Sequence, residues 1–186
     1  MSTWDEEYAG DPETFGKPYP ELVSFVLANV RVGTALDLGC GQGRNALWLA
    51  AQGWQVTAVD SSAIASEQLR RAAAAGELPV RTRVGAVEQF GSDTRFDLVL
   101  ADMVLHHVEE VPSRVLLQVW SRLVGDGGVL CVVTPGPDDD AAEVRQVAAA
   151  EKDWELVHDG AVRHFFGGEE LTFHMIAVRR HAASDG

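Results

Sequence analysis

Cysteine, positive charge and long apolar segments are all scarce in this sequence. Its 186 residues contain two cysteines and 15 Lys and Arg against 28 Asp and Glu, which leaves a formal net charge of −13 at pH 7. Because like charges repel over a Debye length, this deficit of positive charge disfavours DNA, RNA and acidic membranes as partners. We therefore expect neither a nucleic-acid partner nor a membrane partner.

The sequence also lacks the usual signals of export and metal binding. Its apolar runs are all shorter than the roughly 18 residues needed to span a bilayer, and the acidic start Met1–Asp11 has no positively charged leader region. Neither Cys40 nor Cys131 has a companion at C-x-x-C spacing, and the six histidines are scattered. We expect a cytoplasmic protein without a metal site.

What the chain does have is a regular alternation of short apolar runs, rich in Val and Leu, with segments of helical periodicity. This alternation predicts an α/β fold in which helices wrap a parallel sheet that is buried on both faces. The expected strands are Thr34–Leu38, Gln55–Val59, Val80–Val84, Phe96–Ala101 and Val129–Thr134, and the expected helices are Arg44–Gln52, Ala63–Ala75, Pro112–Leu123 and about 138–151.

The C-terminal part predicts an antiparallel hairpin at one edge of the sheet. Its strands are Trp154–His158 and Leu171–Arg179, joined through Gly160, Gly167 and Gly168. The result is a seven-stranded, mostly parallel sheet in a single domain over residues 1–186, with a helical lid segment at 1–30 and the core at 31–181. The cysteines are expected in the first and fifth strands, with one strand between them. They are then at least about twice 4.8 Å apart, so reduced thiols are expected.

Three glycines at alternate positions, Gly39, Gly41 and Gly43, separate the first strand from the helix after it. Glycine suits such a turn because the backbone can adopt unusual angles and a ligand can approach without meeting a Cβ. The following helix start offers unpaired N–H groups to an anionic part of that ligand. A dinucleotide fold requires G-x-G-x-x-G, but Arg44 stands where the third glycine should be, which weakens that interpretation.

The turn reads G-x-G-x-G, and Asp37 stands two residues before it. In this the chain resembles the Rossmann-like S-adenosylmethionine-dependent methyltransferases, from about Trp4 to Arg180. The resemblance implies that S-adenosylmethionine is the cofactor, with Asp37 and the turn around its methionine part. The implied cofactor-binding residues are Trp4, Tyr8, Asp37, Gly39, Cys40, Gly41, Asn45, Asp60, Ser61, Ala86, Val87, Ala101 and Met103.

Two parts of that cofactor site follow the ends of the second and third strands. Asp60 would accept hydrogen bonds from both ribose hydroxyls, although an N-cap of the next helix is an alternative role for it. In many relatives the third strand ends with Gly-Asp, whereas this chain has Gly85 and Ala86. Adenine is therefore expected at the backbone of Ala86 and Val87, with Glu88 as a possible acid.

A narrower resemblance is to the tellurite-resistance methyltransferases. It is carried by the segment Trp4–Tyr8, by Gly-Gln-Gly-Arg-Asn at 41–45 and by the tail Leu171–Arg180. In that family a His and an Arg on the C-terminal hairpin approach the acceptor, and Arg163 and His164 occupy the comparable stretch. The resemblance thus implies a small-molecule acceptor, such as a thiol or a chalcogen compound.

A sulfonium is an activated electrophile, so the enzyme chiefly has to place a nucleophile in line and exclude water. A thiolate, selenide or telluride needs no base, whereas a phenol or an amine does. His106, His107 and His164 are the candidates for that base, although the pair at 106–107 is equally typical of a structural join that caps the next helix. The predicted catalytic residues are His106, His164 and Arg163.

Trp4 and Tyr8 stand one helical turn apart, so both can face the cofactor as a lid or can simply pin the segment to the core. Three functions remain open at this point. The first is a small-molecule methyltransferase, a monomer or homodimer, the second is a dinucleotide-dependent oxidoreductase, and the third is a module that binds S-adenosylmethionine without turnover.

Overall fold

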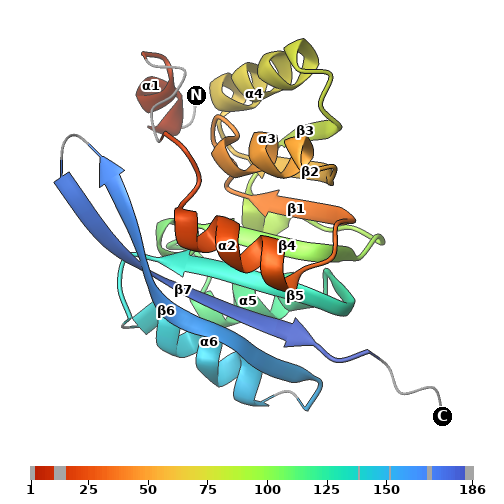
Figure 1. The fold of residues 1–186 in the computed structure, drawn as a ribbon. Coiled ribbons are helices and arrows are strands. Elements are labelled where there is room, and N and C mark those ends of the chain that lie inside the picture. Colours follow the sequence, from red (N-terminus) through yellow and green to blue (C-terminus); the bar gives the residue numbers. More distant parts are fainter. Residues whose placement is uncertain (1–2, 11–15, 138, 151, 167–168, 183–186) are drawn as a thin grey trace.

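A seven-stranded sheet organises the chain (Figure 1). The computed structural model describes residues 3–10, 16–137, 139–150, 152–166 and 169–182. The strand order is β3-β2-β1-β4-β5-β7-β6. The strands are β1 Thr34–Leu38, β2 Gln55–Asp60, β3 Val80–Val84, β4 Phe96–Asp102, β5 Val124–Thr134, β6 Trp154–Phe166 and β7 Glu169–Arg180.

Strands β1 to β5 pair in parallel, and β7 joins β5 antiparallel and carries β6 at the edge. The predicted fold class, a mostly parallel Rossmann-like sheet with an antiparallel C-terminal hairpin, is confirmed. After β3 the chain crosses back to the other side of β1 to form β4. Ligands of open α/β sheets gather at the carboxyl ends of the strands where the order reverses in this way, here at β1 and β4.

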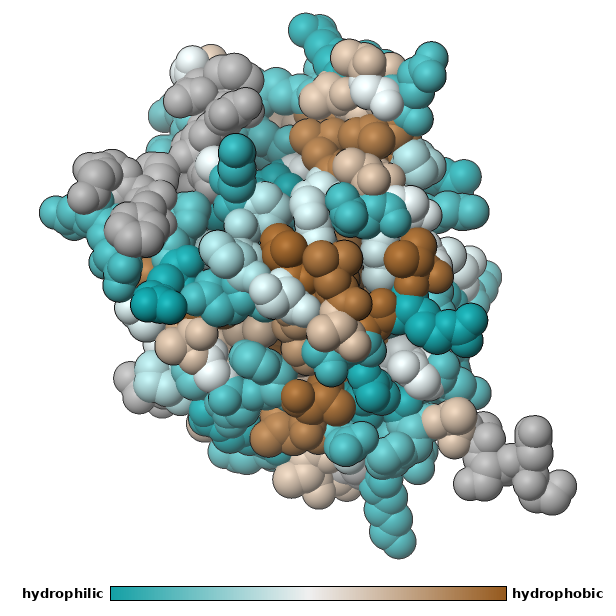
Figure 2. All heavy atoms as spheres, viewed as in Figure 1, coloured by the Kyte–Doolittle hydropathy of each residue, from teal (hydrophilic) through white to brown (hydrophobic). Residues whose placement is uncertain are grey.

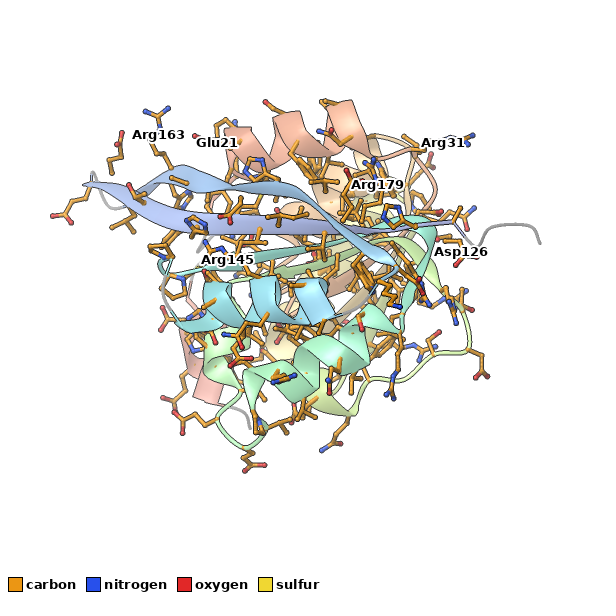
Figure 3. The ribbon with its side chains drawn as sticks, turned by 90° about the horizontal axis from the view of Figure 1, so that it is seen from below. Glu21, Arg31, Asp126, Arg145, Arg163 and Arg179 are labelled. Carbon is orange, nitrogen blue, oxygen red and sulfur yellow. The ribbon has the colours of Figure 1, made fainter. Side chains whose placement is uncertain are left out.

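Helices cover both faces of the sheet. Figure 3 shows α2 on one side of the hairpin and α5 and α6 on the other. The helices are α1 Thr3–Tyr8, α2 Pro20–Asn29, α3 Arg44–Ala51, α4 Ala63–Ala75, α5 Ser113–Ser121 and α6 Asp139–Ala150, with 3₁₀ turns η1 Val87–Gln89 and η2 Leu105–His107. Helix α4 has the predicted bounds, and α3 begins at the predicted residue.

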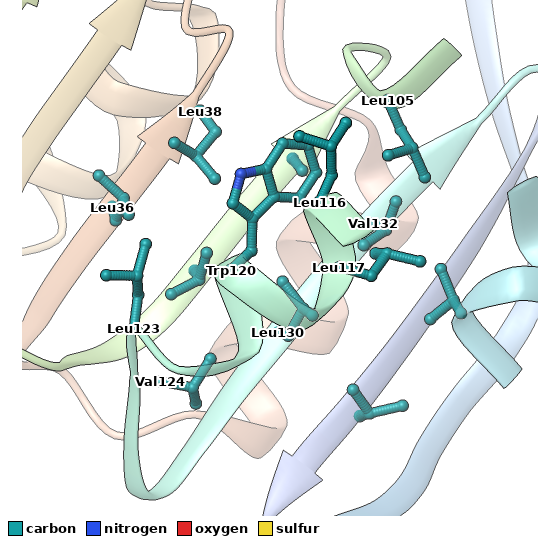
Figure 4. Packing of buried hydrophobic residues seen from close by; sticks show 14 of the residues in the cluster. Leu36, Leu38, Leu105, Leu116, Leu117, Trp120, Leu123, Val124, Leu130 and Val132 are labelled. Atoms are coloured by element: carbon teal, nitrogen blue, oxygen red, sulfur yellow. The ribbon is translucent and has the colours of Figure 1, made fainter. Parts of the chain in front are cut away.

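Successive strand residues face opposite sides of the sheet and so supply two separate hydrophobic cores. In β1, Leu36 and Leu38 pack with α5 and α6, whereas Ala35 packs with α2 and α3. Figure 4 shows the first of these cores around Trp120, which is fully buried. Both faces are therefore covered, which explains the almost uninterrupted apolar character of β1, β4 and β5.

The hairpin differs from its prediction because β6 continues through Gly160 to Phe166. Gly160 pairs with Met175 inside the ladder, so this glycine does not join the strands. A glycine weakens a strand but does not by itself end it, and here the pairing with β7 continues on both sides of Gly160. Gly167 and Gly168 lie outside the described residues.

The structure also differs from the prediction at three other positions. Strand β5 begins at Val124, because Gly127 (φ +75°) and the residues around it form an irregular stretch beside Phe96. Cys40 lies in the turn after β1, since that strand ends at Leu38. Pro112 is the residue before α5 and not its first residue, because its ψ of 136° is outside the helical range.

The surface seen in Figure 2 is mostly polar, with apolar side chains gathered near the middle of this face. Leu27 of α2 and the nearby Val32 are each more than half exposed. No helix in the described part of the chain has the length and apolar character required to cross a membrane.

Replacement of Trp120 tests the α5 core. We expect Trp120→Ala to lower the free energy of unfolding by about 3 to 5 kcal/mol, because the cavity beneath α5 cannot fully collapse. Val115→Ala on the same helix is the control, since Val115 is exposed and its loss costs about 0.5 kcal/mol or less. Urea denaturation measures both changes, and equal losses would contradict the packing described for α5.

Candidate functional site

The glycine turn after β1 is a tight bend against which three other segments pack. Gly39, Gly41 and Gly43 have φ values of +68°, +51° and +90°, a region that favours glycine. A Cβ at Gly39 would lie 2.5 Å from a methyl of Val104, and one at Gly41 would lie 2.7 Å from the Tyr8 hydroxyl. A Cβ at Gly43 would overlap the side chain of Leu69 in α4. The glycines thus let the loop after β4, helix α1 and helix α4 all reach the turn.

Asp60, the last residue of β2, is tied to this turn. Its Oδ2 accepts a hydrogen bond from the Gly41 amide at 2.7 Å, and its Oδ1 accepts one from the Ser62 amide at 2.8 Å. Burial raises the pKa of the carboxyl group, and these amide donors oppose that rise. The N-cap of α4 is Ser62, so the alternative role of Asp60 as that cap is wrong. Ser61, the next residue, is exposed.

Helix α1 docks on the start of α4 through a buried aspartate. The Ser62 hydroxyl donates to Asp5 Oδ1 at 2.6 Å and accepts from the Ala65 amide at 3.1 Å. The Gln68 side chain also donates to the Tyr8 carbonyl at 2.9 Å. Figure 1 shows α1 on the side toward which β1 and β5 point. The N-terminal segment therefore lies at the carboxyl edge of the sheet, beside Asp60.

A second buried aspartate, Asp102, ends β4 and is held by α3. Arg44 forms an ion pair with Asp102 Oδ2, and the Asn45 side-chain amide donates to the same oxygen at 2.7 Å. Arg44 also donates to the Tyr19 hydroxyl at 3.0 Å and lies over its ring. The sequence predicts the stretch from Ala101 to Met103 beside the cofactor but does not single out Asp102, although its position at a strand end is the same signal that singled out Asp60.

Asp37 is the most deeply placed acid of the site. It is 1% exposed, and its Oδ2 has no hydrogen-bond partner. Burial, and next the charge of Asp102, raise the pKa of Asp37 to about 8, while Arg44 opposes the rise. Cys40 is also buried, and desolvation raises the pKa of its thiol, so it is an inert thiol.

The two histidines after β4 lie together in the 3₁₀ turn η2. The His106 and His107 ring centroids are 3.9 Å apart with the rings tilted, and His107 makes a T-shaped contact with Trp4 of α1 at 4.8 Å between centroids. Burial lowers the pKa of both imidazoles, and His107 lowers that of His106 further. The N-cap of α5 is Pro112, so this pair does not cap that helix. Both rings are therefore mainly neutral at pH 7.

The hairpin brings only one of its two predicted residues to the site. His164 lies edge-on to Tyr19, with centroids 5.2 Å apart, and burial followed by the charge of Arg44 lowers its pKa. The Arg163 side chain is 65% exposed and pairs with Glu21 of α2 at 3.4 Å, as Figure 3 shows from below. Its role near the acceptor remains a prediction.

The remaining predicted residues follow the ends of β3 and β4. Ala86 and Val87 begin η1, where Val87 is buried and Glu88 partly buried. Ala101 is fully buried in β4, whereas Met103 is partly exposed and has a left-handed φ of +56°. The Met103 amide donates to Val133 of β5 at 3.0 Å, which holds this unusual backbone in register.

These features can be compared with known proteins. A protein-family model described as a methyltransferase domain matches residues 13–175, well over half of the chain. The chain belongs to this methyltransferase-domain family. Solved methyltransferases of this fold contain S-adenosylmethionine or S-adenosylhomocysteine. The predicted methyltransferase class is therefore confirmed for the matched domain, and the dinucleotide-dependent oxidoreductase is not supported.

The ubiquinone biosynthesis O-methyltransferase of Rickettsia felis is 37% identical over 81 residues, which cover 44% of this chain and 33% of that enzyme. The chain thus matches about a third of that curated relative's length. Two solved structures share the fold of this methyltransferase-domain chain. One comes from work on the conversion of a disulfide bond into a thioacetal group during echinomycin biosynthesis, with TM-score 0.77, 24% identity and coverage of 98% and 92%. The other is TehB from Haemophilus influenzae, with TM-score 0.73, 19% identity and coverage of 88% and 62%.

The contact between α1 and α4 can be tested at Ser62. We expect Ser62→Ala to lower the free energy of unfolding by about 0.5 to 2 kcal/mol, because α4 loses its cap and Asp5 loses a donor. Ser66→Ala on the same helix is the matched control, since the buried Ser66 hydroxyl has no partner and its removal costs little. Hydrogen exchange of residues 3–8 should rise only in Ser62→Ala, and unchanged exchange there would argue against this docking.

Proposed function

We propose that the protein transfers the methyl group of S-adenosylmethionine to a nucleophilic atom of a small-molecule acceptor. The observation that carries this proposal is the charge of the carboxyl edge. Among the described residues, the buried charged side chains are all aspartates, namely Asp5, Asp37, Asp60 and Asp102. Arg44 bonds to one of them. An edge with this excess of negative charge favours a cationic ligand.

The residues of this edge fit a sulfonium nucleoside better than a dinucleotide. A pyrophosphate would bring two negative charges toward the aspartates, whereas the sulfonium and ammonium groups of S-adenosylmethionine are positive. Asp37 Oδ2, Asn45 Oδ1 and Asp102 Oδ1 are buried acceptors without a donor. Buried acceptors are costly when unpaired, so a donor such as an ammonium group or a water is expected beside them.

The cofactor would then be held by the residues inferred from sequence. Asp37, Asn45 and the turn at Gly39, Cys40 and Gly41 would surround its methionine part. Asp60 would hold the ribose, because the Gly41 and Ser62 amides fix the carboxylate in place. The further contacts that we propose come from Ser61, from Ala86 and Val87 at the adenine, and from Ala101, Met103, Trp4 and Tyr8 around the remaining sides.

When bound, S-adenosylmethionine supplies an activated methyl group. The chain then has to orient the acceptor and exclude water. Two aromatic groups flank the carboxyl edge, with Trp4 and His107 on one side and Tyr19, His164 and Phe173 on the other. We propose that they form the walls of the acceptor site, with α1 as its lid.

For the acceptor we favour the sulfur or chalcogen atom of a small compound, which needs no base when ionised. The similar structure connected with conversion of a disulfide bond and the fold shared with TehB support this class. An oxygen or nitrogen acceptor is the second candidate. The lowered pKa values of His106 and His164 favour it, because a neutral imidazole can accept a proton at pH 7. The O-methyltransferase relative supports it as well.

The net charge of −13 supports a small acceptor over a nucleic acid. We further propose one domain over residues 1–186, with a lid segment at 1–30 and a core at 31–181. A cytoplasmic location and a monomeric or homodimeric state complete the proposal. Sedimentation of the purified protein measures the oligomeric state directly.

A product assay tests the proposed reaction. Purified protein is titrated with S-adenosylmethionine by calorimetry and then assayed for S-adenosylhomocysteine with thiols, selenite, tellurite, phenols and amines. Binding together with turnover on one acceptor class supports the proposal and selects that class. Binding without turnover on any acceptor would instead support a module that only binds the cofactor, and absence of binding would refute both.

The role of Asp60 can be measured by substitution. We expect Asp60→Asn to weaken S-adenosylmethionine binding roughly 10- to 150-fold, because a charge-assisted hydrogen bond contributes about 1.5 to 3 kcal/mol. Asp93→Asn removes an exposed acid of the same type and should leave the affinity unchanged. Calorimetry measures the affinity of the wild type and of both variants for S-adenosylmethionine. Equal affinities of the wild type and Asp60→Asn would mean that the ribose binds elsewhere.

The pH profile separates the two acceptor classes. If His106 is the base, kcat/KM should fall at acidic pH, and the fall should begin below the ordinary imidazole range, because burial lowers the pKa of His106 and its neutral form persists to lower pH. His106→Gln should then lower the rate roughly 10²- to 10⁴-fold and abolish this acid limb. His181→Gln, a change near the C-terminus, is the control. An unchanged profile in His106→Gln would exclude His106 as the base.

A further inference from the structure

We propose that this site exchanges a proton for its cationic ligand at Asp37. The carboxyl group is protonated in the free protein and releases its proton to solvent when S-adenosylmethionine binds. The inference rests on the proposed function, because it takes a sulfonium nucleoside as the ligand. Its chemistry is a single ionisation, in which a neutral carboxyl group becomes a carboxylate and one proton, and no other bond changes.

Within the described part of the chain, Asp37 forms no ion pair. The side chain is 1% exposed in the middle of the sheet, and Oδ2 has no hydrogen-bond partner. The Ala46 amide of α3 is the backbone donor that faces the carboxyl group. A carboxylate buried this deeply with one amide donor is costly, and a protonated carboxyl group avoids that cost.

The charges that face Asp37 from the neighbouring elements are mostly negative. Asp102 faces it from β4 and Asp60 from β2, and the Cys40 thiol lies in the turn. Arg44 of α3 is the positive group, and its guanidinium already bonds to Asp102 and Tyr19. Burial and Asp102 together raise the pKa of Asp37 to about 8, so the carboxyl group is mainly protonated at pH 7.

A cation bound beside Asp37 would favour the ionised form of its carboxyl group. A positive charge within about 4 to 6 Å lowers the pKa of a carboxyl group by about 1 to 3 units. S-Adenosylmethionine brings a sulfonium and an ammonium group, and its carboxylate cancels only one of these charges. Binding therefore favours the ionised form of Asp37 and releases the proton that the free protein holds.

Calorimetry in buffers of different ionisation enthalpy counts the released protons. S-Adenosylmethionine is titrated into the wild type, Asp37→Asn and Asp93→Asn in phosphate and in Tris. The ligand's own amino group titrates equally in all three, so the wild type minus Asp37→Asn isolates Asp37. We expect this difference to be about 0.4 to 0.9 proton at pH 7, for a pKa lowered by about 1 to 3 units, and about 0.1 at pH 9, and Asp93→Asn should behave as the wild type.

Affinity gives an independent readout. Below about pH 7.5, the Kd of the wild type divided by that of Asp37→Asn should rise by up to about tenfold for each unit that pH falls. The rise should stop at the pH where the Asp37 carboxyl group of the complex also becomes protonated. If both proteins bind with the same proton release and the same pH dependence, the inference is wrong while the proposed function stands. If the wild type binds no S-adenosylmethionine, the proposed function itself fails.

A spectroscopic measurement avoids the variant, should Asp37→Asn not fold. Infrared difference spectra of the wild type should lose the carbonyl band of a protonated carboxyl group when S-adenosylmethionine is added at pH 7. Isotope labelling of aspartate should shift that band. Spectra in which no protonated aspartate disappears on binding would overturn the proposal.

Discussion

The burial of four aspartates beside one arginine is the constraint on which the rest of the site depends. Asp60 and Asp102 end β2 and β4, and Asp37 is the second-last residue of β1 between them, so the sheet itself brings the three carboxyl groups to one edge. Arg44 forms an ion pair with Asp102, and the Gly41 and Ser62 amides donate hydrogen bonds to Asp60. Like charges buried together are unfavourable, and the remaining excess is relieved either by a proton or by a cationic ligand. Because the strand order places these carboxyl groups together, we expect the site to favour a positively charged ligand.

The glycine turn determines which segments pack beside these carboxyl groups. Each missing side chain is matched by a neighbour from another segment, Val104 at Gly39, Tyr8 at Gly41 and Leu69 at Gly43. The turn thus serves as a common contact for the loop after β4, for α1 and for α4. Helix α1, helix α4 and the loop after β4 therefore all pack on the same turn beside the carboxylates.

Local patterns predicted β1 from its apolar run and α4 from its helical periodicity, and the bounds of both matched to the residue. Predictions failed where glycine was taken as a strand breaker. Gly160 sits within β6 because β7 continues opposite it. In the site, Asp37, Asp60 and the turn could be found because they lie at or directly after the carboxyl ends of β1 and β2. The contacts of Arg44 with Asp102 and of Asp5 with Ser62 join residues 58 and 57 positions apart, so no local pattern contains them.

Some of the unfavourable features of the described residues lie at the carboxyl edge of the sheet. Of the two described non-glycine residues with positive φ, Glu77 directly follows the end of α4, where such a backbone is common, but Met103 follows Asp102 at the carboxyl edge. Three buried unpaired oxygens, on Asp37, Asn45 and Asp102, lie at the same edge. Strain and unmet hydrogen bonds persist in folded proteins mainly where function requires them. Their coincidence points to this edge independently of any resemblance between sequences.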